Sequence, residues 1–278
     1  MNKWLINGTV GDQIAIADRG FTYGDGLFET IAVRDGQIRF FNYHLERLFS
    51  GAEKLFIEPP DRELLSNEAI GLASECEYGT LKIILTRGAG CRGYAPPQDA
   101  KPVRLLSLLP GIRPQQHLYT DGIVVRHCST PIGHSPATAG LKTLGRLEQV
   151  LARAEWQDAS ITEGLMSSTD GHVVCGTMSN LFLVQDGILV VPDLKNCGIK
   201  GIMRRVVLDR ASRVGLQCRI GEIPCAAVND ADELFVTNSL IGIWPIRRVD
   251  KKTYPVGPIT RTLMRELAVA GVSECADQ

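Results

Sequence analysis

One lysine, Lys142, stands near the start of a run whose apolar residues recur at helical spacing. Apolar side chains follow it at intervals of three and four residues, namely Leu144, Leu147, Val150, Leu151 and Ala154. This spacing predicts a helix over residues 141–157 with one buried face. A lysine at the mouth of such a helix can project into the interior, where burial lowers its pKa and the amine becomes a nucleophile toward aldehydes. The alternative is a solvated helix lysine, because buried lysines are rare.

A glycine-rich loop over residues 88–97 carries a second set of chemically useful side chains. Arg87 and Arg92 lie at this loop together with Tyr94. A flexible loop of this kind can present guanidinium groups to carboxylates. The loop therefore predicts a site for an acidic substrate, and ordinary solvated arginines are the alternative.

A third candidate site lies at the start of a predicted helix. The string GIKGIM, residues 198–203, leads into a helix expected over residues 203–214. Backbone N–H groups in the first turn of a helix have no partner within the helix and, together with the helix dipole, favour a bound anion. The sequence therefore predicts that the N–H groups from Gly201 to Met203 bind an anionic group.

The composition limits the class of protein. The chain has 278 residues, of which 44% are hydrophobic and 22% charged, so it can build a sizeable core in one large or two ordinary domains. Its formal charge of −1 and the absence of a basic block argue against nucleic acid as a partner, and no apolar run is long enough to cross a membrane. The eight cysteines have no metal-binding spacing, so neither a metal site nor a disulfide framework is expected. These features predict a cytoplasmic protein.

Strand-like and helical signals alternate along the chain, which predicts a mixed α/β fold. In the first part, apolar runs predict strands at 4–6, 14–16, 30–33, 38–40, 80–86 and 103–109, and helices are expected at 43–56 and 62–75. In the second part, strands are expected at 123–128, 163–167, 173–174, 181–184, 188–191, 217–220 and 233–236, and helices at 141–157, 203–214 and 258–270.

The best candidate for a domain boundary is the proline- and glycine-rich break at residues 110–114, PGIRP. It predicts a smaller N-terminal α/β domain over residues 1–110, an interdomain linker over 111–120 and a larger C-terminal domain over 121–278.

Seven strings occur along the chain in an order typical of one family. They are DRGFTYGDGLFET (18–30), HLERL (44–48), TRGAGCRGY (86–94), LKTLGRLEQVLAR (141–153), SNLF (179–182), KGIMRR (200–205) and TNSLIGIWPI (237–246). In this respect the chain resembles the fold-type IV pyridoxal 5'-phosphate enzymes, which include branched-chain and D-amino-acid aminotransferases and 4-amino-4-deoxychorismate lyase. The strings at 88–94 and 146–153 look most like the lyase branch. The resemblance implies two domains, the second with a barrel-like sheet, a cofactor held between them, and a homodimer.

The resemblance also implies roles for individual residues. Lys142 matches the lysine that forms the Schiff base with pyridoxal phosphate and then acts as general base. Contacts to the cofactor are expected from Arg47, Cys175, Gly201, Ile202, Met203, Asn238, Ser239 and Leu240. The substrate is expected to meet Tyr23, Phe28, Arg87, Arg92 and Tyr94, and Thr30 is a candidate proton relay.

The sequence departs from the family pattern near the expected site. Cys175 stands where relatives usually have a glutamate that keeps the cofactor's ring nitrogen protonated. A neutral thiol cannot supply that negative charge, so the electron sink is weaker, which harms transamination more than a prompt elimination. The alternative is a packing cysteine, with another partner for the ring. Residues common in relatives are also replaced at Ala32, Thr143, Gly145 and Leu147, the last in place of a tyrosine of branched-chain aminotransferases.

The expected activity is that of a lyase which converts 4-amino-4-deoxychorismate to 4-aminobenzoate and pyruvate, a step toward folate. Aromatisation drives this reaction, so a strong electron sink is dispensable. The alternatives are an aminotransferase acting on D-amino acids or small amines, and a degenerate paralogue with weak or no activity.

Overall fold

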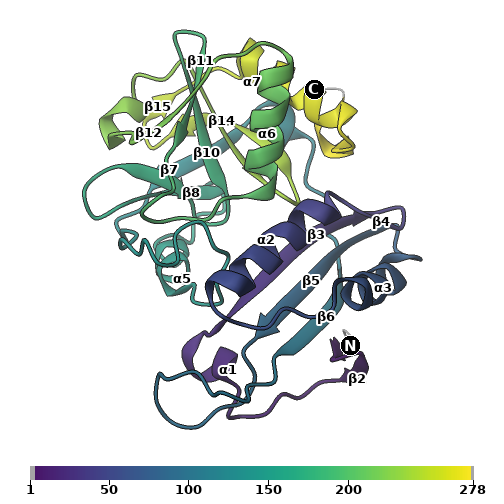
Figure 1. The fold of residues 1–278 in the computed structure, drawn as a ribbon. Coiled ribbons are helices and arrows are strands. Elements are labelled where there is room, and N and C mark those ends of the chain that lie inside the picture. The colour runs from purple at the N-terminus through teal and green to yellow at the C-terminus, as the bar shows by residue number, and fades with distance from the viewer. Residues whose placement is uncertain (1–3, 277–278) are drawn as a thin grey trace. The chain divides into compact units, whose positions relative to one another are not determined.

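The computed structural model describes residues 4–276, which form two compact units. Unit 1 extends to Arg113 and also takes in the later segment Leu141–Gly145. Unit 2 comprises Pro114–Gly140 and the chain from Arg146 onward. Figure 1 shows the elements of each unit. The return of a short segment to unit 1 was not predicted from the sequence, and this segment contains Lys142.

Unit 1 is built on a six-stranded antiparallel sheet. Its strands, in spatial order, are β2 (Thr9–Gly11), β1 (Trp4–Ile6), β6 (Val103–Pro110), β5 (Tyr78–Thr86), β3 (Gly26–Arg34) and β4 (Gln37–Ile38). A tight turn joins β3 to β4, and there Asp35 and Gly36 both have positive φ, 47° and 75°, as a two-residue hairpin loop requires.

Two helices, α2 (Phe41–Lys54) and α3 (Arg62–Ala73), cover one face of this sheet. The core beneath them takes apolar side chains from both helices and from three strands, among them Leu27, Ile31, Leu45, Leu48, Leu65, Leu81, Ile83 and Leu106. A short helix, α1 (Arg19–Tyr23), precedes β3, and the carboxylate of Asp18 caps it by accepting the N–H of Gly20.

Side chains along β3 alternate between the two faces of the sheet. Leu27 belongs to the core under the helices, and Glu29 bonds to α2, so Phe28 and Thr30 point to the opposite face. Lys82 of β5 is the register partner of Thr30, and directly paired residues share a face. We call this side, which carries Phe28, Thr30 and Lys82, the lysine face.

Unit 2 contains a nine-stranded sheet. Its strands, in spatial order, are β12 (Cys218–Gly221), β11 (Ile188–Pro192), β10 (Asn180–Gln185), β13 (Glu233–Asn238), β14 (Gly242–Val249), β7 (Ile123–His127), β8 (Glu163–Ser167) and β9 (Val173–Gly176), and β15 (Lys252–Thr253) pairs with β14. β9 also pairs with β10, through Cys175 and Asn180, so the path from β10 to β9 closes on itself. The barrel-like sheet expected for the second domain is confirmed.

Helices pack with the sheet of unit 2, and the last of them begins at a proline. They are α4 (His117–Thr120), α5 (Leu147–Arg153), α6 (Ile202–Arg213) and α7 (Pro258–Val269), with 3₁₀ turns at Cys225–Val228 and Ser273–Cys275. Pro258 occupies the first turn of α7, where its missing N–H costs nothing. The buried carboxylate of Glu233 accepts the N–H groups of Ile259 (3.1 Å) and Thr260 (2.7 Å), which caps this helix.

The helix predicted over residues 141–157 is wrong in its first part, because α5 begins only at Leu147. Before it, the chain runs along the edge of β3 that β5 does not occupy. The N–H of Phe28 donates to the carbonyl of Lys142, and the N–H of Leu144 donates to the carbonyl of Gly26, both at 3.0 Å. Backbone groups committed to a strand cannot also form a helix, so tertiary pairing overrides the helical pattern here.

The register of this edge pairing orients the side chains. Leu27 and Thr143 form an antiparallel bridge, so Lys142 stands opposite Phe28. Leu141 packs into the core under the helices, and its neighbour Lys142 therefore points to the other side. Lys142 is thus directed to the lysine face by strand alternation.

The prediction of a buried apolar face on α5 is also wrong. Leu147, Val150 and Leu151 are 77%, 61% and 59% exposed. The periodic pattern does form a helix, but no described residue of this chain covers its apolar side.

Elsewhere the differences are smaller. The helices expected at 43–56, 62–75, 203–214 and 258–270 are present with ends shifted by a few residues. No strand forms at residues 14–16, where Ile14 and Ile16 are exposed. The strand β14 was missed because Pro245 and two arginines interrupt its apolar pattern.

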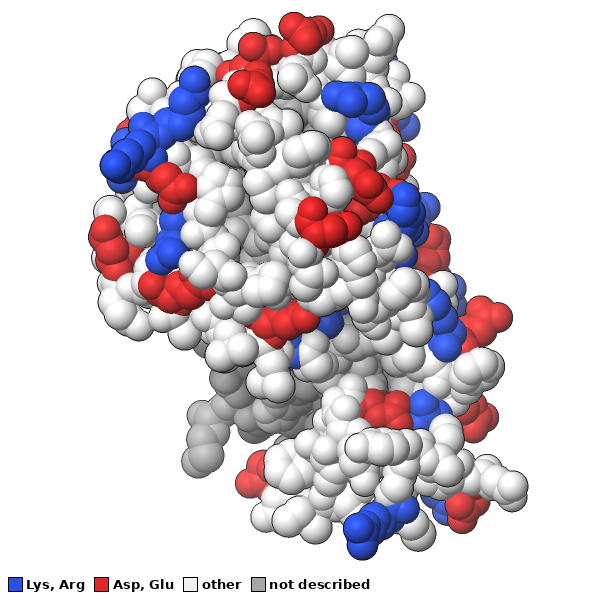
Figure 2. All heavy atoms as spheres, turned by 90° about the vertical axis from the view of Figure 1, so that its left-hand side faces the viewer, with Lys and Arg blue, Asp and Glu red and all other residues white. Residues whose placement is uncertain are grey.

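Among residues 4–276, no helix is both long and apolar enough to cross a membrane. Figure 2 shows basic and acidic side chains interspersed over the face that it draws. This mixture agrees with the formal charge of −1.

Candidate active site

Two lysines share one aromatic ring on the lysine face. The Nζ atom of Lys142 lies 4.2 Å from the centroid of the Phe28 ring, and Nζ of Lys82 lies 3.8 Å from the same centroid. Lys82 Nζ also donates to Oγ1 of Thr30 at 3.5 Å. All four side chains are half-buried. The fold therefore brings together three residues that the sequence singled out and one, Lys82, that it did not.

A buried charge cluster lies behind this face, between β3 and α2. The carboxylate of Glu29 accepts bonds from Nε (2.8 Å) and Nη2 (2.5 Å) of Arg47 and lies 2.6 Å from Nδ1 of His44. Burial alone would raise the pKa of Glu29, but the charges and hydrogen bonds of Arg47 and His44 outweigh it and lower that pKa to about 2. Burial also lowers the pKa of His44, although Glu29 opposes this.

This cluster bears on the predicted role of Arg47 as a phosphate ligand. Two nitrogens of its guanidinium are bonded to Glu29. Glu29 therefore fixes the orientation of Arg47, and the role of Arg47 toward phosphate remains a prediction.

Arg87 is a structural residue of unit 1, which corrects its prediction as a substrate ligand. Its guanidinium donates to Asp25 (Nε–Oδ2 2.7 Å, Nη2–Oδ1 3.0 Å) and to the carbonyls of Leu55 and Phe56, each at 2.7 Å. Only 7% of the side chain is exposed. The donors of Arg87 are used to bind α2 to β3, and it is dropped from the candidate substrate site.

The glycine-rich loop is anchored to α1. Arg19 donates to the carbonyls of Gly93 (2.8 Å) and Tyr94 (3.2 Å), and the N–H of Gly93 donates to the hydroxyl of Tyr23 (3.3 Å). The rings of Tyr23 and Tyr94 meet edge to face, with centroids 5.6 Å apart. Arg92 is exposed. The structure thus places Arg92 and Tyr94 on a loop that contacts Tyr23 of α1.

The segment before α6 has the features expected of an anion site. No side chain caps α6, whose N-cap is Gly201. Asn180 Nδ2 donates to the carbonyl of Ile199 at 2.9 Å, and a side chain at Gly201 would collide with Asn180 Oδ1. Glycine is required at this close approach, and the first-turn N–H groups of Ile202 and Met203 are not taken by a cap. A phosphate group fits such a helix start.

The segment before α6 is hydrogen-bonded to Gly140. The N–H of Gly140 donates to the carbonyl of Gly198 (2.9 Å), and the N–H of Lys200 donates to the carbonyl of Gly140 (3.1 Å). Gly140 has a φ of 83°, which suits glycine. Because Lys142 follows Gly140 by two residues, their Cα atoms are no more than about 7 Å apart.

A second turn was predicted to bind phosphate through Asn238, Ser239 and Leu240. Asn238 Oδ1 accepts the N–H groups of Leu240 (2.9 Å) and Ile241 (3.1 Å), so the side chain of Asn238 organises the turn and the N–H of Leu240 is occupied. Ser239 is the half-buried residue between them.

Cys175 is buried at the point where the ring of strands closes. It lies in a small apolar cluster with Met166, Val174 and Cys197, and it is the register partner of Asn180. Burial, with the nearby carboxylate of Glu163, raises the pKa of the Cys175 thiol far above its usual range. Cys175 is therefore a neutral thiol.

Glu163 is a buried carboxylate that sequence reasoning missed. It accepts bonds from the N–H (3.0 Å) and hydroxyl (2.5 Å) of Thr177, from the hydroxyl of Ser179 (2.8 Å) and from the N–H of Met178 (3.3 Å). These bonds hold the turn between β9 and β10. The sequence signal that could have identified it is that Glu163 is an isolated acidic residue at the first position of an apolar strand, β8.

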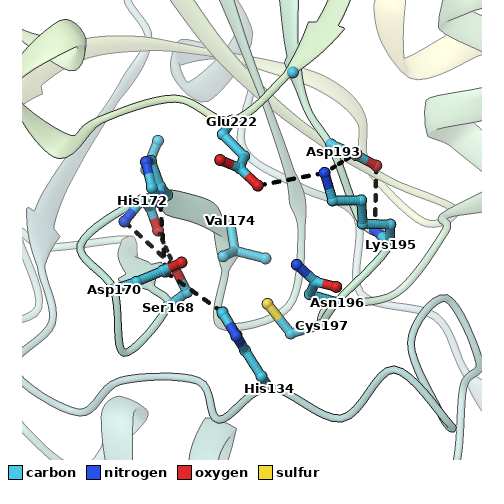
Figure 3. Close-up of a pocket in the computed structure, with 12 residues that line it drawn as sticks. His134, Ser168, Asp170, His172, Val174, Asp193, Lys195, Asn196, Cys197 and Glu222 are labelled. Atoms are coloured by element: carbon cyan, nitrogen blue, oxygen red, sulfur yellow. Dashed lines mark hydrogen bonds and ion pairs between the residues drawn. The ribbon is translucent and has the colours of Figure 1, made fainter.

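A separate polar pocket lies on unit 2 (Figure 3). Asp170 faces both His134 and His172 at 3.4 Å, and Lys195 bridges Asp193 and Glu222. These side chains are paired with one another, and the residues that the structure describes contain no cluster of ligands able to hold a metal ion. We assign no role to this pocket.

Lys82 could have been found from the sequence. It is the one charged residue in the apolar run 80–86 and stands at an alternating position of a strand. A charge at such a position marks the less buried face of the strand.

The fold of the chain is a mixed α/β fold in two units. A family model described as amino-transferase class IV matches residues 26–249. The chain belongs to this family.

Among curated relatives, an aminodeoxychorismate lyase of Vibrio harveyi is 32% identical over 94% of this chain and 98% of its own length. A putative branched-chain-amino-acid aminotransferase of Methanocaldococcus jannaschii is 30% identical over 94% of this chain and 93% of its own.

A similar solved structure is that of 4-amino-4-deoxychorismate lyase from Pseudomonas aeruginosa, with a TM-score of 0.92 and 44% identity over 96% of this chain and 98% of that one. A T.th. branched-chain amino acid aminotransferase, solved with pyridoxamine 5'-phosphate, has a TM-score of 0.83 at 20% identity over 97% of this chain and 94% of that one, which shows the shared fold.

The structural role of Arg87 predicts the effect of its removal. Arg87→Met leaves the carboxylate of Asp25 and two carbonyls without their main donor, so it should lower the free energy of unfolding by about 3 kcal/mol. Arg92→Met, on the same loop but exposed, should change it by less than about 0.5 kcal/mol. Urea denaturation of both variants measures this, and a wild-type stability for Arg87→Met would contradict the assignment.

The cluster around Glu29 predicts a pH dependence of stability. The carboxyl has a pKa of about 2 when folded and 4.5 as a free group, so its stabilisation is complete above pH 4.5 and is lost as the pH falls toward 2. Glu29→Gln should cost about 3 kcal/mol at pH 7. It should also make stability fall less steeply between pH 4.5 and 3 than in the wild type. Thermal unfolding against pH tests this, and parallel curves would refute it.

Proposed function

We propose that this protein is a pyridoxal 5'-phosphate-dependent lyase that converts 4-amino-4-deoxychorismate to 4-aminobenzoate and pyruvate, a step toward folate. The observation that carries the proposal is the strand pairing that directs Lys142 to the lysine face beside Phe28. Full-length similarity to two aminodeoxychorismate lyases supports the choice of reaction.

The residues present fit the cofactor. The uncapped start of α6 suits a phosphate, with Gly201, Ile202 and Met203 as backbone donors and Ser239 in the neighbouring turn as a further candidate. Asn238 acts by shaping that turn, and Arg47, oriented by Glu29, is a further candidate for contact with the cofactor. When bound, the cofactor supplies an aldehyde for a lysine amine and a ring that withdraws electrons from the substrate carbon.

Lys142 then has two tasks in this proposal. Its Nζ would hold the cofactor covalently, and as a free amine it would take the proton from the ring carbon that carries the substrate amine. The Phe28 ring under Nζ limits the directions from which the amine can be approached. Thr30 remains a candidate for passing on a proton, since its hydroxyl lies on the same face.

Cys175 supports an elimination rather than a transamination. A thiol that stays neutral cannot hold a proton on the cofactor's ring nitrogen, so charge on the substrate carbon is less well delocalised. Elimination of the enolpyruvyl group and formation of an aromatic ring remove that charge at once. An aminotransferase acting on D-amino acids or small amines is the second candidate, supported by the 30% identical relative.

Product analysis with a Lys142 variant tests the proposal. The wild type should release equal amounts of 4-aminobenzoate and pyruvate, whereas an aminotransferase would give a keto acid and pyridoxamine phosphate. Lys142→Ala should lower kcat by about three orders of magnitude or more, because both covalent binding and proton removal are lost. Borohydride reduction of the wild type should add the mass of the reduced cofactor to the Lys142 peptide.

The control for this experiment is Lys54→Ala, an exposed lysine at the end of α2, which should retain both activity and labelling. Cofactor mass on another lysine, or lyase activity in Lys142→Ala, would contradict the proposal.

We also infer a homodimer in the cytoplasm. The exposed face of α5, formed by Leu147, Val150 and Leu151, is an apolar patch of the kind that marks an interface. A second copy of the chain can cover it through a two-fold contact. The eight free cysteines are compatible with a reducing compartment.

Charge on this patch should separate the copies. Leu147→Glu with Leu151→Glu places two carboxylates in the proposed contact and should turn a dimer into a monomer in light scattering after gel filtration. Exposed Glu148→Gln on the same helix is the matched control and should remain dimeric. A wild type that is monomeric at all concentrations, or a double variant that remains dimeric, would refute the assignment.

A further inference from the structure

The lysine face holds a cation whose partner is not a carboxylate of the protein. Lys82 Nζ contacts the hydroxyl of Thr30 at 3.5 Å and the Phe28 ring at 3.8 Å. Within residues 4–276, no carboxylate lies at ion-pair distance from it. Glu29 acts on Lys82 only from the helix-covered side of the sheet, where Arg47 and His44 already neutralise it.

A half-buried ammonium without an anion is unusual, because burial disfavours the charge unless something compensates it. The Phe28 ring offers a cation–π contact, and the Thr30 hydroxyl offers one weak hydrogen bond. An ammonium has three donors, so Lys82 retains capacity for an anionic ligand.

Lys82 lies within reach of a molecule held beside Lys142. Both Nζ distances, 3.8 Å and 4.2 Å, run to the same ring centroid, so the two nitrogens are close enough for one small ligand to span them. That span suits a small cyclic amine that reacts at one end and carries a carboxylate at the other. Arg87 does not compete for this carboxylate, since its donors are bonded within unit 1.

We propose that Lys82, together with Thr30, binds a carboxylate of the substrate and so selects a cyclic amino dicarboxylate. This inference rests on the proposed function and identifies the residue of unit 1 that recognises the carboxylate of the substrate. The Thr30 hydroxyl accepts a bond from Lys82 and is able to donate its own hydrogen to the same carboxylate. Lys82 is thus a specificity-determining residue, whereas Lys142 carries the chemistry.

The charge of Lys82 also sets a pH limit on binding. Burial lowers the pKa of Lys82 to about 8, and Glu29 only partly opposes this from across the sheet. Phe28 and Thr30, which face it, do not titrate in this range, and Lys142 is the like-charged neighbour on the same face. The ammonium is present below pH 8 and lost above it, so KM for the dicarboxylate should rise above pH 8.

Three variants test the proposal with steady-state kinetics. Lys82→Met keeps the apolar stem and removes the charge. It should raise KM about 10- to 100-fold, which corresponds to the loss of one or two charge-assisted hydrogen bonds, and it should leave kcat within about twofold of the wild type. Lys82→Arg should restore most of the affinity and abolish the KM rise above pH 8, because guanidinium stays charged. Lys54→Met, an exposed lysine of the same unit, should match the wild type.

Calorimetry with 4-aminobenzoate separates this inference from the proposed function. The wild type should bind this probe at least about 10-fold more tightly than Lys82→Met, whether or not the protein turns over a substrate. Borohydride labelling of Lys142 in Lys82→Met should be unchanged, which excludes a general loss of structure. Equal affinity of the two proteins for the probe, no binding to the wild type, or an unchanged KM in Lys82→Met would overturn the inference. Failure of the lyase assay alone would overturn the proposed function.

Discussion

The arrangement of the candidate site depends on two backbone hydrogen bonds at the edge of one strand. They join Phe28 to Lys142 and Gly26 to Leu144, and they hold a segment with helical spacing in an extended β-bridge along β3. Strand alternation then places Leu141 in the core and Lys142 on the opposite face. The position of the reactive amine is therefore determined by the register of a β-pairing, which leaves it less freedom than a loop would.

The residues on one face of β3 stabilise the fold, and those on the other face are the candidates for catalysis and substrate binding. On the helix side, Glu29 and Arg47 form a buried ion pair to which His44 is hydrogen-bonded, and Arg87 and Asp25 bind the ends of α2 and β3 together. On the other side, Lys82 and Lys142 both lie against the Phe28 ring. Among residues 4–276, Lys82 has no carboxylate at ion-pair distance, which leaves its positive charge for an acidic ligand.

Much of the fold could be predicted from apolar spacing, because α2, α3, α6 and α7 and most strands have their pattern within a short window. The local sequence pattern could not predict the pairing of the segment 141–145. Its spacing is helical, but its backbone is hydrogen-bonded to β3, which lies far earlier in the chain. The same limit applies to Arg87. From the sequence alone, an arginine on a loop is predicted to bind a ligand. Its actual partners, Asp25, Leu55 and Phe56, are distant in sequence and become known only from the fold.

A crystal structure of the protein grown with pyridoxal phosphate tests the central claim most directly. The account predicts continuous density from Nζ of Lys142 to the cofactor, with the phosphate at the N–H groups that follow Gly201. Density that joins the cofactor to Lys82 or Lys200, or a Lys142 side chain directed into the core under α2, would contradict it.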